Sequence, residues 1–261
     1  MHMGPRVATA ALLVCTISTI SQGQGTIESR VAAAPDGTVR MSFAARPDVC
    51  GDGDCNISTN HHRRFSDDVE WDVECDHGPV RLVLSVRDHT PVALHTYVGG
   101  QWRPPRAGAA VTDLGTVSAP QASEYLIGLT RHASSGVASD AIFPATLADS
   151  SRGIWPGLVA IARDASRPTH TREQAVFWLG QAAADVSGSL DSIATDDTVD
   201  REVREQAVFA ISQRPHDESV PILIRIAQSN HDPEVRRKAL FWLGQSGDPR
   251  AIDLFEKILT R

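Results

Sequence analysis

The residue types best suited to chemistry gather between positions 50 and 77. They are Cys50, Asp52, Asp54, Cys55, His61, His62, Cys75 and His77. Thiolates, imidazoles and carboxylates are the ligands that zinc takes in proteins, but the strong zinc signatures need two closely spaced pairs such as Cys-x-x-Cys. The spacing here differs from those signatures. We therefore expect no metal ion and no cofactor at this cluster.

The compartment decides what these cysteines do. Arg6 gives the N-terminus a positive charge, Val7 to Ile20 is mostly apolar, and small residues follow at a cleavage position, so residues 1–23 are expected to be a signal peptide. The apolar run is short for a transmembrane helix. Cys15 suggests a lipid anchor as the alternative, but Val14 stands where a lipobox needs a small residue. We expect export to the bacterial periplasm or outside the cell, without stable membrane insertion after cleavage.

An exported protein ordinarily uses its cysteines in disulfides. The mature chain would retain Cys50, Cys55 and Cys75, which cannot all pair internally. Residues 69–75 alternate apolar and acidic types, so Cys75 would point inward from a half-buried strand. A Cys50–Cys75 bridge would close a long loop and is the favoured pairing. Cys50–Cys55 is the rival, and the favoured pairing leaves Cys55 free or bridged to a partner.

The elements around the cluster are expected to form a small antiparallel β module over residues 27–100. Residues 80–86 and 92–98 alternate apolar and polar types around a short turn, which predicts a β-hairpin. Residues 39–43 give an earlier strand. Prolines and a glycine in 101–117 predict a linker. Because so small a sheet buries little surface, it should need a disulfide or packing against the following helices.

The rest of the chain repeats with a period of 32 residues. The arginines Arg172, Arg204 and Arg236 follow this spacing, and so do Ala175, Ala207, Ala239 and Phe177, Phe209, Phe241. A second apolar series runs in the same register through Leu158, Leu190, Ile222 and Leu254. Apolar pairs four residues apart predict two amphipathic helices in each unit. Fixed self-similarity at this period predicts an α-solenoid.

The sequence Asp-Pro-Glu-Val-Arg-Arg-Lys-Ala-Leu-Phe-Trp-Leu-Gly at 232–244, with a weaker copy at 200–208, resembles HEAT repeats. The likeness is strongest to the short bacterial type that also occurs in phycobiliprotein lyases. This resemblance implies antiparallel helix pairs and a recurring arginine that pairs with a neighbouring acidic residue. Asp200 lies one period before Asp232, so both are expected to cap helices.

A capping box with a proline at Ser118–Gln121 marks the start of the helices. The solenoid is therefore expected to span 118–261. The fold class is α+β by segment, with a C-terminal solenoid of HEAT-type helix pairs preceded by the β module.

Composition and motifs exclude several functions. The formal net charge of −7 argues against nucleic acid as a partner. Phosphate-binding glycine loops, Gly-x-Ser-x-Gly and His-Glu-x-x-His are absent from the sequence. We therefore expect no enzymatic activity and assign no catalytic residue.

Binding of other proteins along the solenoid, as an exported interaction or scaffolding protein, is the predicted function. The binding candidates are Trp178 and Trp242, each beside a phenylalanine, with Arg225 and Lys257. The second helices of the units are expected to line the concave side. A metal- or redox-responsive regulator, with Cys50, Cys55, Cys75 and the nearby histidines as the sensor, is the alternative. An accessory subunit or lyase-like enzyme is the third hypothesis.

Overall fold

The computed structural model describes residues 25–54, 56–59, 75–148, 153–181 and 187–260. The expected signal peptide, Cys55, His61, His62 and residues 69–74 of the expected strand lie outside the described residues. Within the part of the chain that is described, no helix combines the length and the apolar character needed to cross a membrane.

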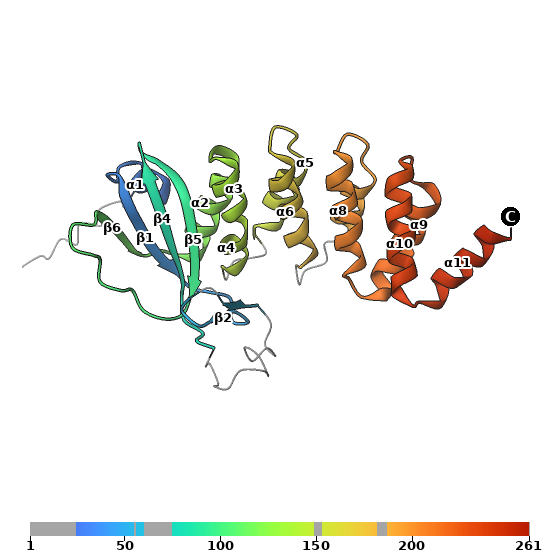
Figure 1. Ribbon diagram of the computed structural model, residues 1–261, viewed down its shortest axis with the longest axis horizontal. Coiled ribbons are helices and arrows are strands. Elements are labelled where there is room, and N and C mark those ends of the chain that lie inside the picture. The colour runs from blue at the N-terminus through green and yellow to red at the C-terminus, as the bar shows by residue number, and fades with distance from the viewer. Residues whose placement is uncertain (1–24, 55, 60–74, 149–152, 182–186, 261) are drawn as a thin grey trace, which may run out of the picture.

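A sheet lies at one end of the molecule, and a row of helices extends from it (Figure 1). The sheet has the order β5-β4-β1-β6. Its strands are β1 (Gly37–Phe43), β4 (Val80–Arg87), β5 (Thr90–Val98) and β6 (Val111–Thr116). β4 pairs antiparallel with β5, as the hairpin pattern predicted. It also pairs antiparallel with β1, and β6 pairs parallel with β1. Two short strands, β2 (Cys50–Gly51) and β3 (Ile57–Ser58), form a separate hairpin.

Strand β6 lies inside residues 101–117, so the expectation of a plain linker there is wrong. β6 pairs with the edge of β1 that would otherwise leave backbone groups unpaired, and Thr38 N donates to Ala110 O at 2.9 Å. The pairing shifts register between Arg40 and Ser42, and Gly115 has a φ of 72°. This irregularity explains why the short sequence carries no clean strand pattern.

One face of the sheet is apolar and is covered by helices. Val80, Leu82, Leu84 and Val86 alternate with partly exposed residues along β4, as the period of two predicts. α1 (Ile27–Ala32), which the sequence pattern did not predict, and α3 (Ser135–Asp140) pack against β5. The sheet and the helices share one hydrophobic core, so the β module is packed on the first helices rather than standing alone.

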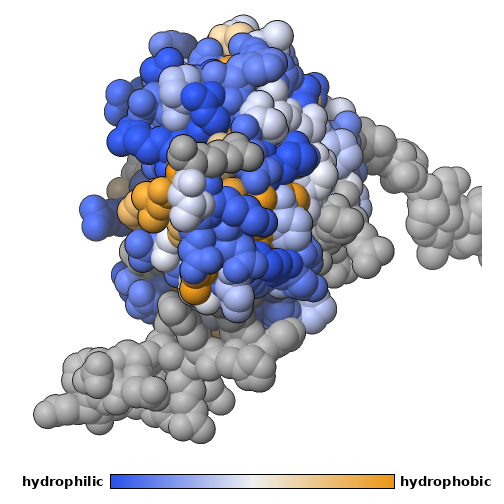
Figure 2. Space-filling model, turned by 90° about the vertical axis from the view of Figure 1, so that its right-hand side faces the viewer, coloured by the Kyte–Doolittle hydropathy of each residue, from blue (hydrophilic) through white to orange (hydrophobic). Residues whose placement is uncertain are grey.

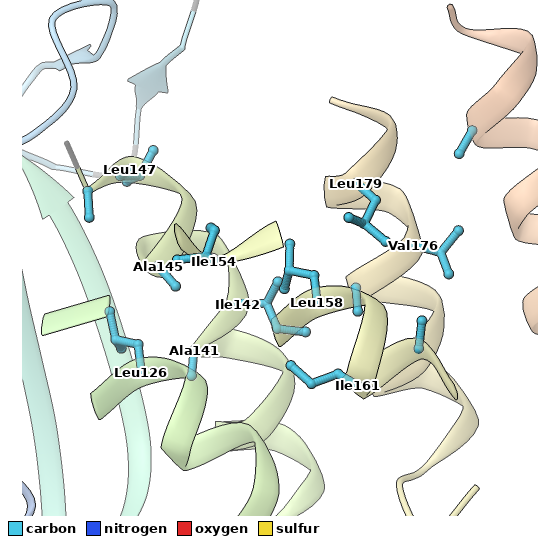
Figure 3. Packing of buried hydrophobic residues seen from close by; sticks show 14 of the residues in the cluster. Leu126, Ala141, Ile142, Ala145, Leu147, Ile154, Leu158, Ile161, Val176 and Leu179 are labelled. Atoms are coloured by element: carbon cyan, nitrogen blue, oxygen red, sulfur yellow. The ribbon is translucent and has the colours of Figure 1, made fainter. Parts of the chain in front are cut away.

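Helix α2 (Ala119–His132) begins at the predicted capping box. Ser118 Oγ accepts the backbone N–H of Gln121, whose side chain returns to the Ser118 N–H. The later helices are α4 (Ile142–Leu147), α5 (Trp155–Arg163), α6 (Thr169–Gly180), α7 (Ser187–Ala194), α8 (Arg201–Ser212), α9 (His216–Ser229), α10 (Pro233–Ser246) and α11 (Pro249–Leu259). Apolar side chains fill the space between the first of them, where Ile142, Leu158 and Ile161 point toward one another (Figure 3).

Two of the recurring arginines, Arg172 and Arg204, hold neighbouring repeats together. Arg172 is 1% exposed; its Nε donates to Ala162 O at 3.1 Å, and its guanidinium pairs with Asp200. Arg204 repeats the arrangement one period later, with Val199 O at 3.0 Å and Asp232 at 2.9 Å. These contacts support the structural role that the HEAT resemblance implied.

The expectation that Asp200 caps its helix through its side chain is wrong. Asp200 stands at the N-cap position of α8, but its carboxylate accepts no cap hydrogen bond and pairs with Arg172 instead. Asp232 both caps its helix and pairs with an arginine: one carboxylate oxygen accepts the Glu234 N–H at 2.9 Å, and the other accepts from Arg204.

The helices form two layers of unequal spacing. α6, α8 and α10 pack directly on one another, whereas α5, α7 and α9 make few mutual contacts. A Cβ atom added to Gly180 in α6 would lie 2.8 Å from Ala210 Cβ in α8. The α6–α8–α10 layer is therefore the more closely packed of the two. That the second helices, α7, α9 and α11, line the concave side stays a prediction.

Candidate partner-binding surface

Six aromatic side chains follow one another along α4, α6, α8 and α10. This aromatic row consists of Phe143, Phe177, Trp178, Phe209, Phe241 and Trp242. Trp178 stacks on Phe143 with ring centroids 4.9 Å apart. Trp242 contacts Phe209 at 5.2 Å. Each tryptophan thus packs on a phenylalanine of the preceding unit, so the row links successive repeats.

The order of the residues along each helix sets this arrangement. Ala175, Val176 and Leu179 of α6 are buried, and Phe177 and Trp178 are partly exposed between them. Adjacent residues of a helix point about 100° apart, so the two rings of a Phe-Trp pair meet edge to face. The centroids are 5.2 Å apart in the first pair and 5.0 Å in the second.

The two predicted tryptophans are half-buried, and the exposed ring belongs to a phenylalanine. Trp242 Nε1 is buried and has no hydrogen-bond partner among the described residues, whereas Phe241 is 54% exposed. The 32-residue series Phe177, Phe209 and Phe241 carried this signal in the sequence. The choice of the tryptophans missed that Phe241 is the more exposed ring of its pair.

The row has one gap. Ala210 stands where the neighbouring units have Trp178 and Trp242, and it is 2% exposed against Gly180. Because Gly180 and Ala210 have small side chains or none, α6 and α8 approach closely at this point. The exposed aromatic surface of the row is greatest at α10, where Phe241 lies.

Charged side chains of both signs flank the row at α8 and α10. Lys238 Nζ lies 3.9 Å from a Glu205 carboxylate oxygen, and Arg237 pairs with Glu234. Paired charges of this kind keep the surface polar around the apolar side chains of the aromatic row. The rim therefore resembles that of protein-binding surfaces, where a polar border surrounds an apolar centre.

The two predicted cations lie in the other layer, away from the tryptophans. Arg225 of α9 is 49% exposed and forms an ion pair with Asp191 of α7. Lys257 is exposed in the last turn of α11. The four predicted candidates thus divide between the two layers of helices and do not form one cluster.

The C-terminal end of the row of helices presents apolar side chains to solvent. Ile252, Ile258 and Leu259 of α11 are each at least half exposed. Figure 2 views this end of the molecule and shows hydrophobic residues in orange among hydrophilic ones. α11 packs only through the few buried positions of its amphipathic face, such as Ala251 and Leu254.

The cysteine cluster is arranged around a disulfide. The Sγ atoms of Cys50 and Cys75 are 1.97 Å apart, with Cα atoms at 5.4 Å, which is the pairing that the sequence favoured. His77 Nδ1 contacts Val49 O at 3.0 Å. Among the described residues, histidine, cysteine and carboxylate side chains do not gather in a group of three suited to a metal ion.

Comparison with known proteins gives a match within the helical part of the chain. A family model for HEAT repeats matches residues 192–261. A search of curated proteins finds no match to the chain. HEAT repeats generally mediate interactions between proteins, and their fold is typically a non-catalytic scaffold. Residues 192–261 thus match HEAT repeats, and the paired helices and the arginine–aspartate contacts agree with that match.

Proposed function

We propose that this chain is an exported protein-interaction or scaffolding protein that binds its partner along the aromatic row. The single observation that carries this proposal is the exposure of Phe241, at 54%, at the end of a row whose other rings are partly buried. A large aromatic ring on a rigid helix is a typical energetic centre of a protein interface, because burying it costs little conformational entropy.

The surface also suggests the partner's chemistry. The aromatic row is apolar, and the charged side chains that flank it already pair with one another, as Lys238 does with Glu205. A segment that presents apolar side chains at regular spacing, such as an amphipathic helix, fits such a surface. We therefore expect binding to depend weakly on salt concentration.

Photo-crosslinking tests the assignment of the row. The photoreactive p-benzoylphenylalanine replaces Phe241 in the full chain, and the matched control places it at Gln228, which is exposed on α9 in the layer of α5, α7 and α9. We expect a discrete adduct from position 241 in the native compartment and little from position 228. Equal or stronger adducts from position 228 would place the partner on the other layer.

Export is tested separately. N-terminal sequencing of the protein recovered from the periplasm or medium should give a chain that begins near residue 24. An uncleaved chain that begins at Met1 in the cytosolic fraction would contradict export and leave the proposal for the aromatic row intact.

A redox-responsive regulator is the second candidate, supported by the Cys50–Cys75 disulfide and by partial exposure of Cys75. Thiol counting and metal analysis of the purified mature protein distinguish the two functions. One disulfide that persists under mild reduction favours the scaffold. Three reduced thiols with stoichiometric zinc would favour the regulator.

A further inference from the structure

The open face of the sheet carries a pocket separate from the aromatic row. Its volume is about 350 Å³, and the residues that define it are Arg40, Arg81, Tyr97, Trp102 and Arg103. We call it the arginine pocket. Residues of β1, β4 and β5 line it, together with residues of the segment that follows β5.

The strand pleat places these residues together from distant parts of the sequence. Val39 and Met41 of β1 are buried in the core, so Arg40 between them points to the opposite face. Arg81 occupies the same face of β4, between the buried Val80 and Leu82, and Tyr97 pairs with it across the strands. Three strands thus contribute adjacent side chains to one surface.

Trp102 holds the two strand arginines in place. Its ring lies 5.1 Å from the Arg40 guanidinium carbon and 5.5 Å from that of Arg81. A guanidinium over an indole face is attracted by the ring while its edge remains available for hydrogen bonds. The arginines are therefore preorganised rather than extended into solvent.

Both arginines retain donors after their structural contacts are counted. Arg40 Nε donates to Asp113 at 2.8 Å, and Arg81 donates to the carbonyl oxygens of Gly99 and Gly100. Within the described part of the chain, the Arg40 terminal nitrogens and Arg81 Nη1 have no partner, and neither has the Arg103 guanidinium.

The charge of the pocket opposes that of the chain. Three arginines line it, against Asp54 in the lining and Asp113 beside Arg40, although the whole chain carries −7. Val83 and Pro105 supply apolar walls beside the two rings. A ligand matched to this lining has an anionic group for the guanidinium donors and an apolar or aromatic body for the walls.

We propose that the arginine pocket binds a small organic anion, in which a carboxylate or phosphate group is attached to an aromatic or apolar body. The anionic group accepts hydrogen bonds from the free edges of Arg40 and Arg103, and the body packs on Trp102 and Tyr97. This site is independent of the proposed protein-binding row.

Calorimetric titration of the full mature protein tests the proposal with benzoate and phenyl phosphate as probes. Benzyl alcohol is the neutral control, and inorganic phosphate is the control without a body. We expect saturable binding of one or both aromatic anions and none of benzyl alcohol. Preference between benzoate and phenyl phosphate identifies the anionic group, and tighter binding than that of inorganic phosphate shows the role of the body.

Variants locate the binding. Arg103→Gln removes an exposed cation with no partner among the described residues, so the fold should persist, and we expect about a tenfold loss of affinity. Arg87→Gln, an exposed residue of the same sheet outside the pocket, should leave affinity unchanged. The indole N–H resonance of Trp102 should shift with the probe.

Several results would overturn the proposal. They are the absence of binding of both anions at millimolar concentration, binding that survives both Arg103→Gln and Arg40→Gln, or equal binding of benzyl alcohol. Binding of a glutamate-rich peptide but of neither small probe would also contradict it, because the pocket would then be part of a protein interface.

Discussion

The pentapeptide Phe-Trp-Leu-Gly-Gln occurs in α6 from Phe177 and again in α10 from Phe241, and the two copies have different surroundings. In α6, the next helix of the layer lies so close that a Cβ on Gly180 would reach Ala210 at 2.8 Å. In α10, a Cβ on Gly244 would meet, among the described residues, only Phe255, at 3.9 Å. Identical residues thus belong to a close helix–helix contact in α6 and to an accessible surface in α10.

The same contrast extends to the arginines of these helices. Arg172 is 1% exposed and bonds both a backbone carbonyl and Asp200. Arg236 is partly exposed and donates to the carbonyls of Asn230 and His231. The following helix therefore decides whether a repeat position stabilises the fold or remains available for binding.

The largest difference is expected at the arginines. Arg172→Ala should lower the free energy of unfolding by about 3–5 kcal/mol, because it empties a buried space and leaves the Ala162 carbonyl without its donor. Arg236→Ala should cost about 1 kcal/mol. Urea unfolding followed by circular dichroism measures both values. Equal losses would show that the two helices are equivalent in stability despite their different burial.

The glycines test close packing directly. Gly180→Ala should destabilise the protein by about 1–3 kcal/mol, since the new methyl group meets the Ala210 side chain and backbone. Gly244→Ala has room and should stabilise α10 by up to about 1 kcal/mol through helix propensity. Thermal unfolding of the two variants should therefore shift in opposite directions. A stabilised Gly180→Ala variant would mean that α6 and α8 are less closely packed than described.

The phenylalanines separate stability from binding. Phe177→Ala should cost about 1–2 kcal/mol, because its ring is partly buried against Trp178. Phe241→Ala should cost less than about 1 kcal/mol, because more than half of its side chain is already in water. Only Phe241→Ala should also weaken partner binding while the fold is retained, as measured by recovery of the crosslinked partner from a second site on α10. Unchanged recovery would remove Phe241 from the interface.

The smallest difference between the C-terminal helices and the region of α6 is expected in their stability at low pH. Arg250 hydrogen-bonds to the side chain of Asp248 and lowers its pKa from 3.8 to about 2. Asp164, in the turn before α6, also has a lowered pKa, mainly because the Ser166 side chain hydrogen-bonds to it. A carboxylate with a lowered pKa stabilises the folded state above about pH 4, and this contribution disappears as the pH falls through the folded pKa.

Asp248→Asn should therefore flatten the fall in stability between about pH 4 and 2 more than Asp164→Asn does. Hydrogen exchange of α11 and α6 over this range measures the effect. A larger change from Asp164→Asn would place the acid-sensitive contact before α6 instead of at the C-terminal helix.

Part of the architecture follows directly from residue patterns. The repeat of 32 residues, the capping box at Ser118 and the alternation along β4 predicted elements that the structure contains. The alternation of residues 69–75 and the expectation of export favoured the Cys50–Cys75 pairing, which the structure contains. The irregular strand β6 was missed, because its pairing with β1 depends on a residue more than seventy positions away, as in the Arg40–Asp113 contact.

The arginine pocket was missed for a related reason. Arg40, Arg81 and Trp102 are far apart in sequence, and each alone is an ordinary surface residue of a strand or loop. Only the pairing of β1 with β4 and the path of the segment after β5 bring them together. The choice of Trp178 and Trp242 located the aromatic row, but exposure at Phe241 depends on which helix packs next.

Local chemistry alone therefore determines the period, the helix starts and the faces that must be buried, because these depend on residues within one or two turns. The tertiary structure decides which copy of Phe-Trp-Leu-Gly-Gln is enclosed and which arginines keep donors free. Those outcomes depend on the distance to the next helix or strand. Gly180 of α6 lies close against Ala210 of α8, whereas Phe241 of α10 is exposed to solvent.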